Sequence, residues 1–88
     1  MSATVEQLKQ RLAVLEPQQL DVTDESALHT GHSGAAGGGG HYRLIIVSEH
    51  FKGMNAVARH RAIYQALGDM MREQIHALSI SAFTPEEF

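Results

Sequence analysis

The run HYRLIIVS, residues 41–48, decides the fold because it is the most apolar stretch of the chain. Its four consecutive large aliphatic residues, at 44–47, fall far short of the roughly 20 apolar residues that a membrane span requires. An unbroken run of this length is typical of a strand that is covered on both faces or central in a sheet. We therefore place the centre of a sheet at residues 41–48.

Two further strands are predicted from apolar residues that alternate with polar ones. Leu20 and Val22 alternate with polar neighbours over about residues 19–24, which is the period of a half-buried strand. Leu78 and Ile80 continue the same pattern over about residues 77–83. The sequence therefore predicts three strands, with the apolar run in the middle of the chain order.

Two helices are predicted from apolar residues that recur with a period of 3.6. The first covers residues 4–16 and ends before Pro17, which cannot continue a helix. The second covers about residues 55–73, with Asn55 as its N-cap. Gly68 lies inside this second helix at a cost of about 1 kcal/mol relative to alanine, and we attribute it to a closely packed neighbouring element.

The order helix, strand, strand, helix, strand predicts an α+β fold, with helices covering one face of a three-stranded sheet. The first two strands can pair as an antiparallel hairpin. The third strand follows a helix long enough for a right-handed crossover, which allows parallel pairing and makes the sheet mixed. At 88 residues, the chain is predicted to be a single domain, 1–88, with a flexible glycine- and histidine-rich loop over 26–40.

Composition excludes several classes of protein. Apolar residues make up 43% of the chain and charged residues 19%, a balance typical of a folded globular domain rather than a disordered one. The chain contains no cysteine, so it supplies no disulfide, thiolate nucleophile or sulfur ligand. Its net charge of −3 provides no global attraction to nucleic acid. The N-terminal residues show no signal-peptide pattern, which favours a soluble, cytoplasmic protein.

Histidines are the strongest candidates for metal chemistry in this chain. His29, His32 and His41 are spaced H-x2-H-x8-H, and imidazole is a common ligand for zinc, copper, iron and nickel. The alternative is that they are solvated loop residues. His76 stands at the predicted junction between the second helix and the last strand, where it is either a ligand or a cation that complements the helix dipole.

Basic residues near the second helix raise the possibility of nucleic-acid binding. Lys52 lies in the turn before this helix, and Arg59 and Arg61 lie in its first half. The alternative is a solvated face whose arginines pair with Glu49 or Asp69.

Catalysis fits this sequence poorly. The segment from Asp24 to Ser26 is followed by several histidines, but no nucleophile elbow, phosphate-cradling motif or paired carboxylate accompanies it. Ser26 is better explained as the anchor of a turn. We therefore do not expect an enzyme.

Four blocks of this sequence together resemble the BolA family. They read DESALHTGH at 24–32, HYRLIIVSEHFKGM at 41–54, RHRAIYQAL at 59–67 and IHALSISAFTPEE at 75–87. The resemblance implies a fold like the class II KH domain, with the order α-β-β-α-β. KH domains usually grip RNA with a GXXG loop, whereas the corresponding turn here contains Gly53 alone, so this mode of RNA binding is not expected.

The resemblance also implies a partner and a cofactor. Members of the family pair with monothiol glutaredoxins and share a [2Fe-2S] cluster, in iron–sulfur cluster trafficking or iron homeostasis. Carried over to this chain, the ligand candidates are His29 and His76, with His32 as a rival for the loop position and His41 in a structural role. A cysteine-free chain would supply only imidazole ligands, and the glutaredoxin and its glutathione would supply thiolates.

The family is also described as containing transcriptional regulators. In this sequence the residues that would contact DNA are Lys52, Arg59 and Arg61. A third possibility is an adaptor that binds glutaredoxin without ligating the cluster.

Overall fold

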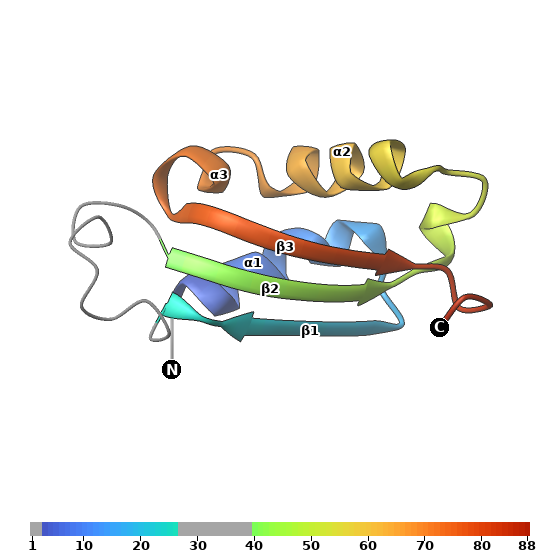
Figure 1. The fold of residues 1–88 in the computed structure, drawn as a ribbon, viewed down its shortest axis with the longest axis horizontal. Coiled ribbons are helices and arrows are strands. Elements are labelled where there is room, and N and C mark those ends of the chain that lie inside the picture. Colours follow the sequence, from blue (N-terminus) through green and yellow to red (C-terminus); the bar gives the residue numbers. More distant parts are fainter. Residues whose placement is uncertain (1–2, 27–39) are drawn as a thin grey trace.

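The computed structural model describes residues 3–26 and 40–88 and confirms the α+β arrangement (Figure 1). Within these residues a three-stranded sheet has the order β1-β2-β3, with β2 antiparallel to β1 and parallel to β3. The elements in chain order are α1 (Ala3–Leu12), the 3-10 helix η1 (Ala13–Leu15), β1 (Gln19–Asp24), β2 (Gly40–Val47), the 3-10 helix η4 (Glu49–Phe51), α2 (Ala56–Leu67), α3 (Met70–Glu73) and β3 (Ile75–Phe83).

The apolar run at 44–47 belongs to β2, the central strand, as predicted. In the sheet register Leu44 lies between Val22 of β1 and Ile80 of β3. The even-numbered residues of β2 from 42 to 46 are buried and share one hydrophobic core with residues of α1, α2 and α3. Burying one such side chain contributes about 1.5–3 kcal/mol, so this shared core is what holds the helices on the sheet.

The two ends of the sheet are built differently (Figure 1). At one end, which we call the loop end, β1 finishes and β2 and β3 begin. At the other, which we call the turn end, β2 and β3 finish and η4 leads into α2. Residues 27–39, the greater part of the predicted loop, lie outside the described residues, and His29 and His32 lie there with them.

The prediction of one continuous helix over 55–73 is wrong. Asn55 caps α2 as expected, because its side-chain oxygen accepts a hydrogen bond of 2.9 Å from the Ala58 N–H. The helix ends at Leu67, because Gly68 adopts φ 56° and ψ −127°, which lies outside the helical region and suits only glycine. Arg11 of α1 donates a 2.8 Å hydrogen bond to the Leu67 carbonyl, so a neighbouring element does lie close to Gly68.

Two other predicted boundaries move. The first α-helix stops at Leu12 and tightens into η1, and Glu16 is left-handed at φ 52°. The residue before a proline is sterically disfavoured in the right-handed helical region, which explains why the helix cannot reach Glu16. Strand β3 begins at Ile75, two residues before the predicted start, so His76 lies within a strand and not at a helix terminus.

No helix within residues 3–26 and 40–88 has the length and apolar character of a membrane span.

Candidate functional site

A register irregularity at the loop end determines how His76 is presented. Gly40 of β2 pairs with Ile75, and the next residue, His41, pairs with Ala77, so the ladder skips His76. Irregularities of this kind, such as β-bulges, re-aim side chains. Here Ile75 is buried in the core, whereas His76 is exposed.

The skipped residue lies beside a second histidine. The ring centroids of His41 and His76 are 5.0 Å apart, with an angle of 38° between the ring planes. The sequence favours His76 as a ligand and His41 in a structural role, and it contains no pattern that predicts a contact between the two rings. Across 3–26 and 40–88, no set of three or more His, Asp or Glu side chains is grouped so that it could hold a metal ion. Among the described residues, the pair therefore offers two imidazoles and no third ligand beside them.

Short-range hydrogen bonds fix the backbone on either side of the loop. The Ser26 N–H donates to Asp24 Oδ1 at 2.9 Å, and Ser26 Oγ accepts from the His41 N–H at 3.1 Å. The Glu25 N–H donates to the His41 carbonyl at 2.8 Å. Ser26 thus anchors a turn, as predicted, and its hydroxyl oxygen accepts from a backbone N–H of β2. These bonds hold His41 in place next to His76.

Gly40 is a further residue of this site, and no sequence pattern distinguishes it from the other glycines of the loop segment. Its N–H donates to the Gln74 carbonyl at 3.0 Å, and the Gln74 side chain donates to Gln7 of α1 at 2.8 Å. A Cβ atom at Gly40 would collide with Ser26 Oγ and the Tyr42 ring. One glycine among several in the loop segment is therefore required for packing, which glycine content alone does not reveal.

At the turn end, Arg59 is enclosed by acceptors. Its Nη1 and Nη2 donate to the two carboxylate oxygens of Glu87 at 2.6 and 3.1 Å. Its Nε donates to the Met54 carbonyl at 2.9 Å, and Nη1 also donates to the Ala82 carbonyl at 3.1 Å. Only 13% of its side chain is exposed. The carboxylate that pairs with Arg59 is therefore Glu87, and neither Glu49 nor Asp69.

The hydrogen bonds from Arg59 lower the pKa of the Glu87 carboxyl from 4.5 to about 2, with a further contribution from the Thr84 N–H. Lys52 lies 3.1 Å from Glu86 and 3.7 Å from Glu49. The hydrogen bond between Lys52 and Glu86 raises the pKa of the lysine and lowers the pKa of the glutamate. Two of the three predicted DNA-contacting cations are thus already paired with carboxylates.

Arg61 differs from the other two basic residues. It is exposed on α2 and forms no ion pair within the described part of the chain. It lines a shallow hollow of about 320 Å³ together with Val57, His60 and Tyr64. Of the predicted nucleic-acid set, Arg61 is the cation most available to an external anion.

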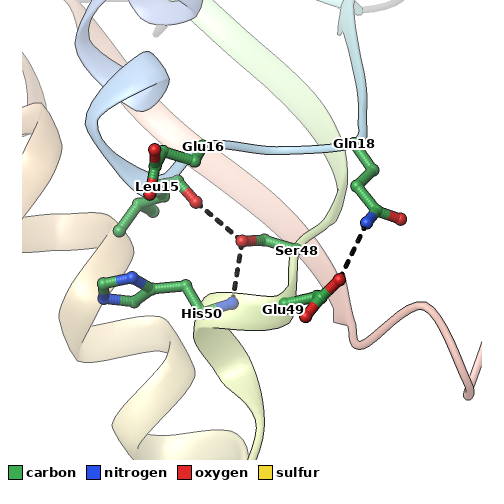
Figure 2. Close-up of a pocket in the computed structure, with 6 residues that line it drawn as sticks. All are labelled: Leu15, Glu16, Gln18, Ser48, Glu49 and His50. Carbon is green, nitrogen blue, oxygen red and sulfur yellow. Dashed lines mark hydrogen bonds between the residues drawn. The ribbon is translucent and has the colours of Figure 1, made fainter.

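A separate pocket of about 430 Å³ lies at the turn end, between the end of η1 and η4 (Figure 2). Ser48, which is buried, donates to the Leu15 carbonyl at 2.6 Å and accepts from the His50 N–H at 3.0 Å. Gln18 donates to Glu49 at 3.2 Å. None of the predicted ligands or DNA-contacting residues lines this pocket, and its hydrogen bonds serve to join the start of β1 to the end of β2.

Comparisons with known proteins agree on one family. The family model described as BolA-like protein matches residues 12–87. SufE-like protein 1 of Arabidopsis thaliana is 45% identical over 78 residues, which cover 83% of this chain and 21% of that protein. DNA-binding transcriptional regulator BolA of Haemophilus influenzae is 40% identical over 73 residues, which cover 83% of this chain and 68% of that protein.

Solved structures show the same relationship. The BolA domain of SufE1 from Arabidopsis thaliana superposes with a TM-score of 0.86 and 39% identity, over 100% of this chain and 99% of that one. BolA1 from Arabidopsis thaliana gives a TM-score of 0.84 and 37% identity, over 100% and 98% of the two chains. The chain spans 21% of the length of SufE-like protein 1 and 48% of the chloroplastic protein BOLA1 of the same plant.

Proposed function

The chain belongs to the BolA-like protein family, and from this premise we propose that it is a binding partner of a monothiol glutaredoxin, with which it shares a [2Fe-2S] cluster. The role would be in iron–sulfur cluster trafficking or iron homeostasis. The observation that carries the proposal is the His41–His76 pair, 5.0 Å apart at the loop end of the sheet. It supplies imidazole donors in a chain that has no cysteine.

The donor set fits half of such a cluster. A [2Fe-2S] centre needs four protein or small-molecule ligands, and two imidazoles can replace two thiolates on one iron. Two ligands from this chain would leave the other iron to the cysteine of the glutaredoxin and to glutathione. When bound, the cluster supplies one-electron redox chemistry, at a potential that imidazole ligation raises.

His76 is the first ligand that we propose, because its side chain is exposed and makes no hydrogen bond or ion pair with another described residue. The second is His29, with His32 as its rival. Ser26 Oγ contacts the His41 N–H, and the His41 ring lies beside the His76 ring. Position 29 follows Ser26 by three residues, which span at most about 11 Å. A ligand at position 29 therefore has a short path to His76. Because its ring lies beside that of His76, His41 is a third candidate for the second ligand.

The test is to mix the chain with a cluster-loaded monothiol glutaredoxin and record visible absorption and circular dichroism. We expect a spectrum distinct from that of the glutaredoxin alone, which His76→Ala abolishes. Separate alanine variants at His29, His32 and His41 identify the second ligand as the one whose loss has the same effect. His50→Ala, an exposed histidine at the turn end, is the matched control. A spectrum unchanged by mixing, or one that survives His76→Ala, would refute the proposal.

Calorimetry with the apo glutaredoxin measures docking, and the visible spectrum of the mixture distinguishes cluster ligation from docking alone. If the chain is only an adaptor, the His29→Ala, His76→Ala double variant binds the apo partner as the wild type does and leaves the visible spectrum of the mixture unchanged. If it is a ligand donor, the double variant still binds the apo partner but loses the shared-cluster spectrum.

A second candidate function is DNA binding. The Haemophilus influenzae relative carries that function in its name, and Arg61 is an exposed cation on α2. Phosphate contacts make affinity fall steeply with salt, by roughly one power of the salt concentration per contact. Arg61→Glu should therefore weaken binding to a DNA duplex and flatten its salt dependence, and it should leave the cluster spectrum unchanged. Binding to duplex DNA that Arg61→Glu does not weaken would argue against this candidate.

A further inference from the structure

Two consecutive glutamates cover two of the predicted DNA-contacting cations. Glu86 pairs with Lys52, and Glu87 pairs with Arg59 through both carboxylate oxygens. We call Glu86 and Glu87 the acidic cover. The cations belong to the turn after β2 and to α2, whereas the acidic cover follows β3, so the contact joins segments that are distant in the sequence.

In the Arg59–Glu87 pair, the cation is the fixed member and the carboxylate is the exchangeable one, whereas Lys52 and Glu86 are both exposed. The guanidinium of Arg59 is held by the carbonyls of Met54 and Ala82 and lies 6.0 Å from the centre of the Phe51 ring. Its side chain is 13% exposed, against 47% for Glu87. If the carboxylate leaves, the arginine therefore remains held by the two carbonyls, and the N–H groups of Nη1 and Nη2 that donate to Glu87 lose their acceptor.

The vacated position fits a phosphate. A guanidinium fork binds the paired oxygens of phosphate in the same bidentate way as those of a carboxylate. A hollow of about 320 Å³ adjoins Arg59 and is lined by Asn55, Ala56 and His60, among others. Lys52 lies on the preceding turn, and the exposed Arg61 lies further along α2. Lys52 and Arg59, which pair with consecutive glutamates, offer two cations to the repeated charges of a polyanion, whereas Arg61, two residues after Arg59, lies on another side of α2.

We propose that the acidic cover competes with nucleic-acid phosphates for Lys52 and Arg59, and so holds this basic site in a low-affinity state. The proposal rests on the second candidate function above. Binding of a nucleic-acid backbone requires it to displace Glu86 and Glu87 and to overcome their negative charge. Removing the charges of Glu86 and Glu87 should therefore raise the affinity for nucleic acid more than removing two negative charges elsewhere on the protein does.

The test compares two double variants of the full chain with equal net charge. Glu86→Gln, Glu87→Gln removes the acidic cover, and Glu6→Gln, Glu73→Gln removes two exposed carboxylates that form no ion pair within the described residues. The probe is a fluorescein-labelled duplex DNA, followed by anisotropy over a range of salt concentrations. We expect the first variant to bind about three- to tenfold more tightly than the second, with a steeper salt dependence, because two more cations contact phosphate.

Lys52→Gln, added to the variant without the acidic cover, should remove part of the gain, and circular dichroism verifies that each variant is folded. Equal affinity of the two double variants, with binding still weakened by Arg61→Glu, would overturn the acidic cover and leave the DNA function standing. No binding by any variant would overturn both. The last comparison uses two competitors, a polyglutamate peptide and an unlabelled DNA duplex. Equal displacement of the labelled DNA by both would overturn the assignment of the site to phosphate.

Discussion

The two ends of the sheet differ in whether their polar side chains have hydrogen-bond or ion-pair partners. At the turn end, Arg59 and Lys52 each face a carboxylate, and Ser48 donates to one backbone group and accepts from another. At the loop end, the exposed imidazole of His76 contacts the His41 ring and forms no hydrogen bond or ion pair with another described residue.

This difference reflects which interactions hold each end of the sheet together. The loop end is held by hydrogen bonds that the backbone N–H groups of Ser26, Gly40 and His41 donate, and none of these bonds involves the imidazole of His76. The turn end is held by side chains whose donors and acceptors are mutually satisfied. We therefore expect side-chain substitutions at the turn end to affect stability, and those at the loop end to affect ligand binding.

The largest effect should come from Phe51, at the turn end. Its side chain is fully buried in the shared core, and replacing a buried phenylalanine by alanine typically costs about 3–5 kcal/mol. His76→Ala, at the loop end, should change the free energy of unfolding by no more than about 0.5 kcal/mol, because the side chain is exposed. Urea denaturation of both variants measures the contrast. A cost for His76→Ala close to that for Phe51→Ala would break the distinction between the two ends.

Gly40→Ala tests whether the backbone holds the loop end. The new methyl group would collide with Ser26 Oγ and the Tyr42 ring, and such overpacking costs about 1–3 kcal/mol. Gly53, at the turn end, has φ 79° with open space around it. Asparagine tolerates a left-handed conformation, so Gly53→Asn should lower the free energy of unfolding less than Gly40→Ala does. Thermal unfolding compares the two variants. A neutral Gly40→Ala would mean that the loop end is less tightly packed than the structure shows.

Ser48→Ala should have a smaller effect, again at the turn end. The substitution removes the 2.6 Å hydrogen bond to the Leu15 carbonyl and the acceptor for the His50 N–H. Because the adjoining pocket can admit water to these groups, we expect a loss of about 1 kcal/mol in urea denaturation, the usual net value of one hydrogen bond. Ser79→Ala, an exposed serine of β3, is the control and should be neutral. A loss for Ser79→Ala equal to that for Ser48→Ala would show that the buried hydrogen bonds are not the cause.

Much of the fold follows from periodicity. The apolar run of β2, the alternation in β1 and β3 and the cap at Asn55 were all predicted because each depends on neighbouring residues in the sequence. Gly68 was misjudged for the opposite reason. A glycine within a helical pattern costs only about 1 kcal/mol, so the pattern alone cannot distinguish a tolerated glycine from one whose positive φ ends the helix.

The candidate site was less predictable, because its geometry depends on contacts between distant segments. His76 was singled out from the sequence, but its contact with His41 depends on a register irregularity that leaves no local pattern. The partner of Arg59 was sought among nearby carboxylates on the chain, whereas tertiary packing supplies Glu87 from beyond β3. The assignment of His29 and His32 as alternative loop ligands stays a prediction, because both lie outside the described residues.

The smallest effect concerns the pH dependence of the turn end. Folding lowers the pKa of Glu87 from 4.5 to about 2, chiefly through hydrogen bonds from Arg59. A carboxyl group with a depressed pKa contributes stability above its unfolded pKa, and this contribution is lost as the pH falls through the folded value. Wild type should therefore lose more stability than Glu87→Gln between about pH 4.5 and 2, and the two should converge near pH 2.

Urea denaturation at a series of pH values measures this difference, with Glu6→Gln as the control for net charge. Because Glu87 is half exposed, 1 M salt, with a Debye length of about 3 Å, should reduce the difference between wild type and Glu87→Gln. Parallel pH profiles for wild type and Glu87→Gln would mean that the carboxylate is not held by Arg59 in solution. The turn end would then present a free cation to external anions, as the loop end presents a free imidazole, and the contrast between the two ends would disappear.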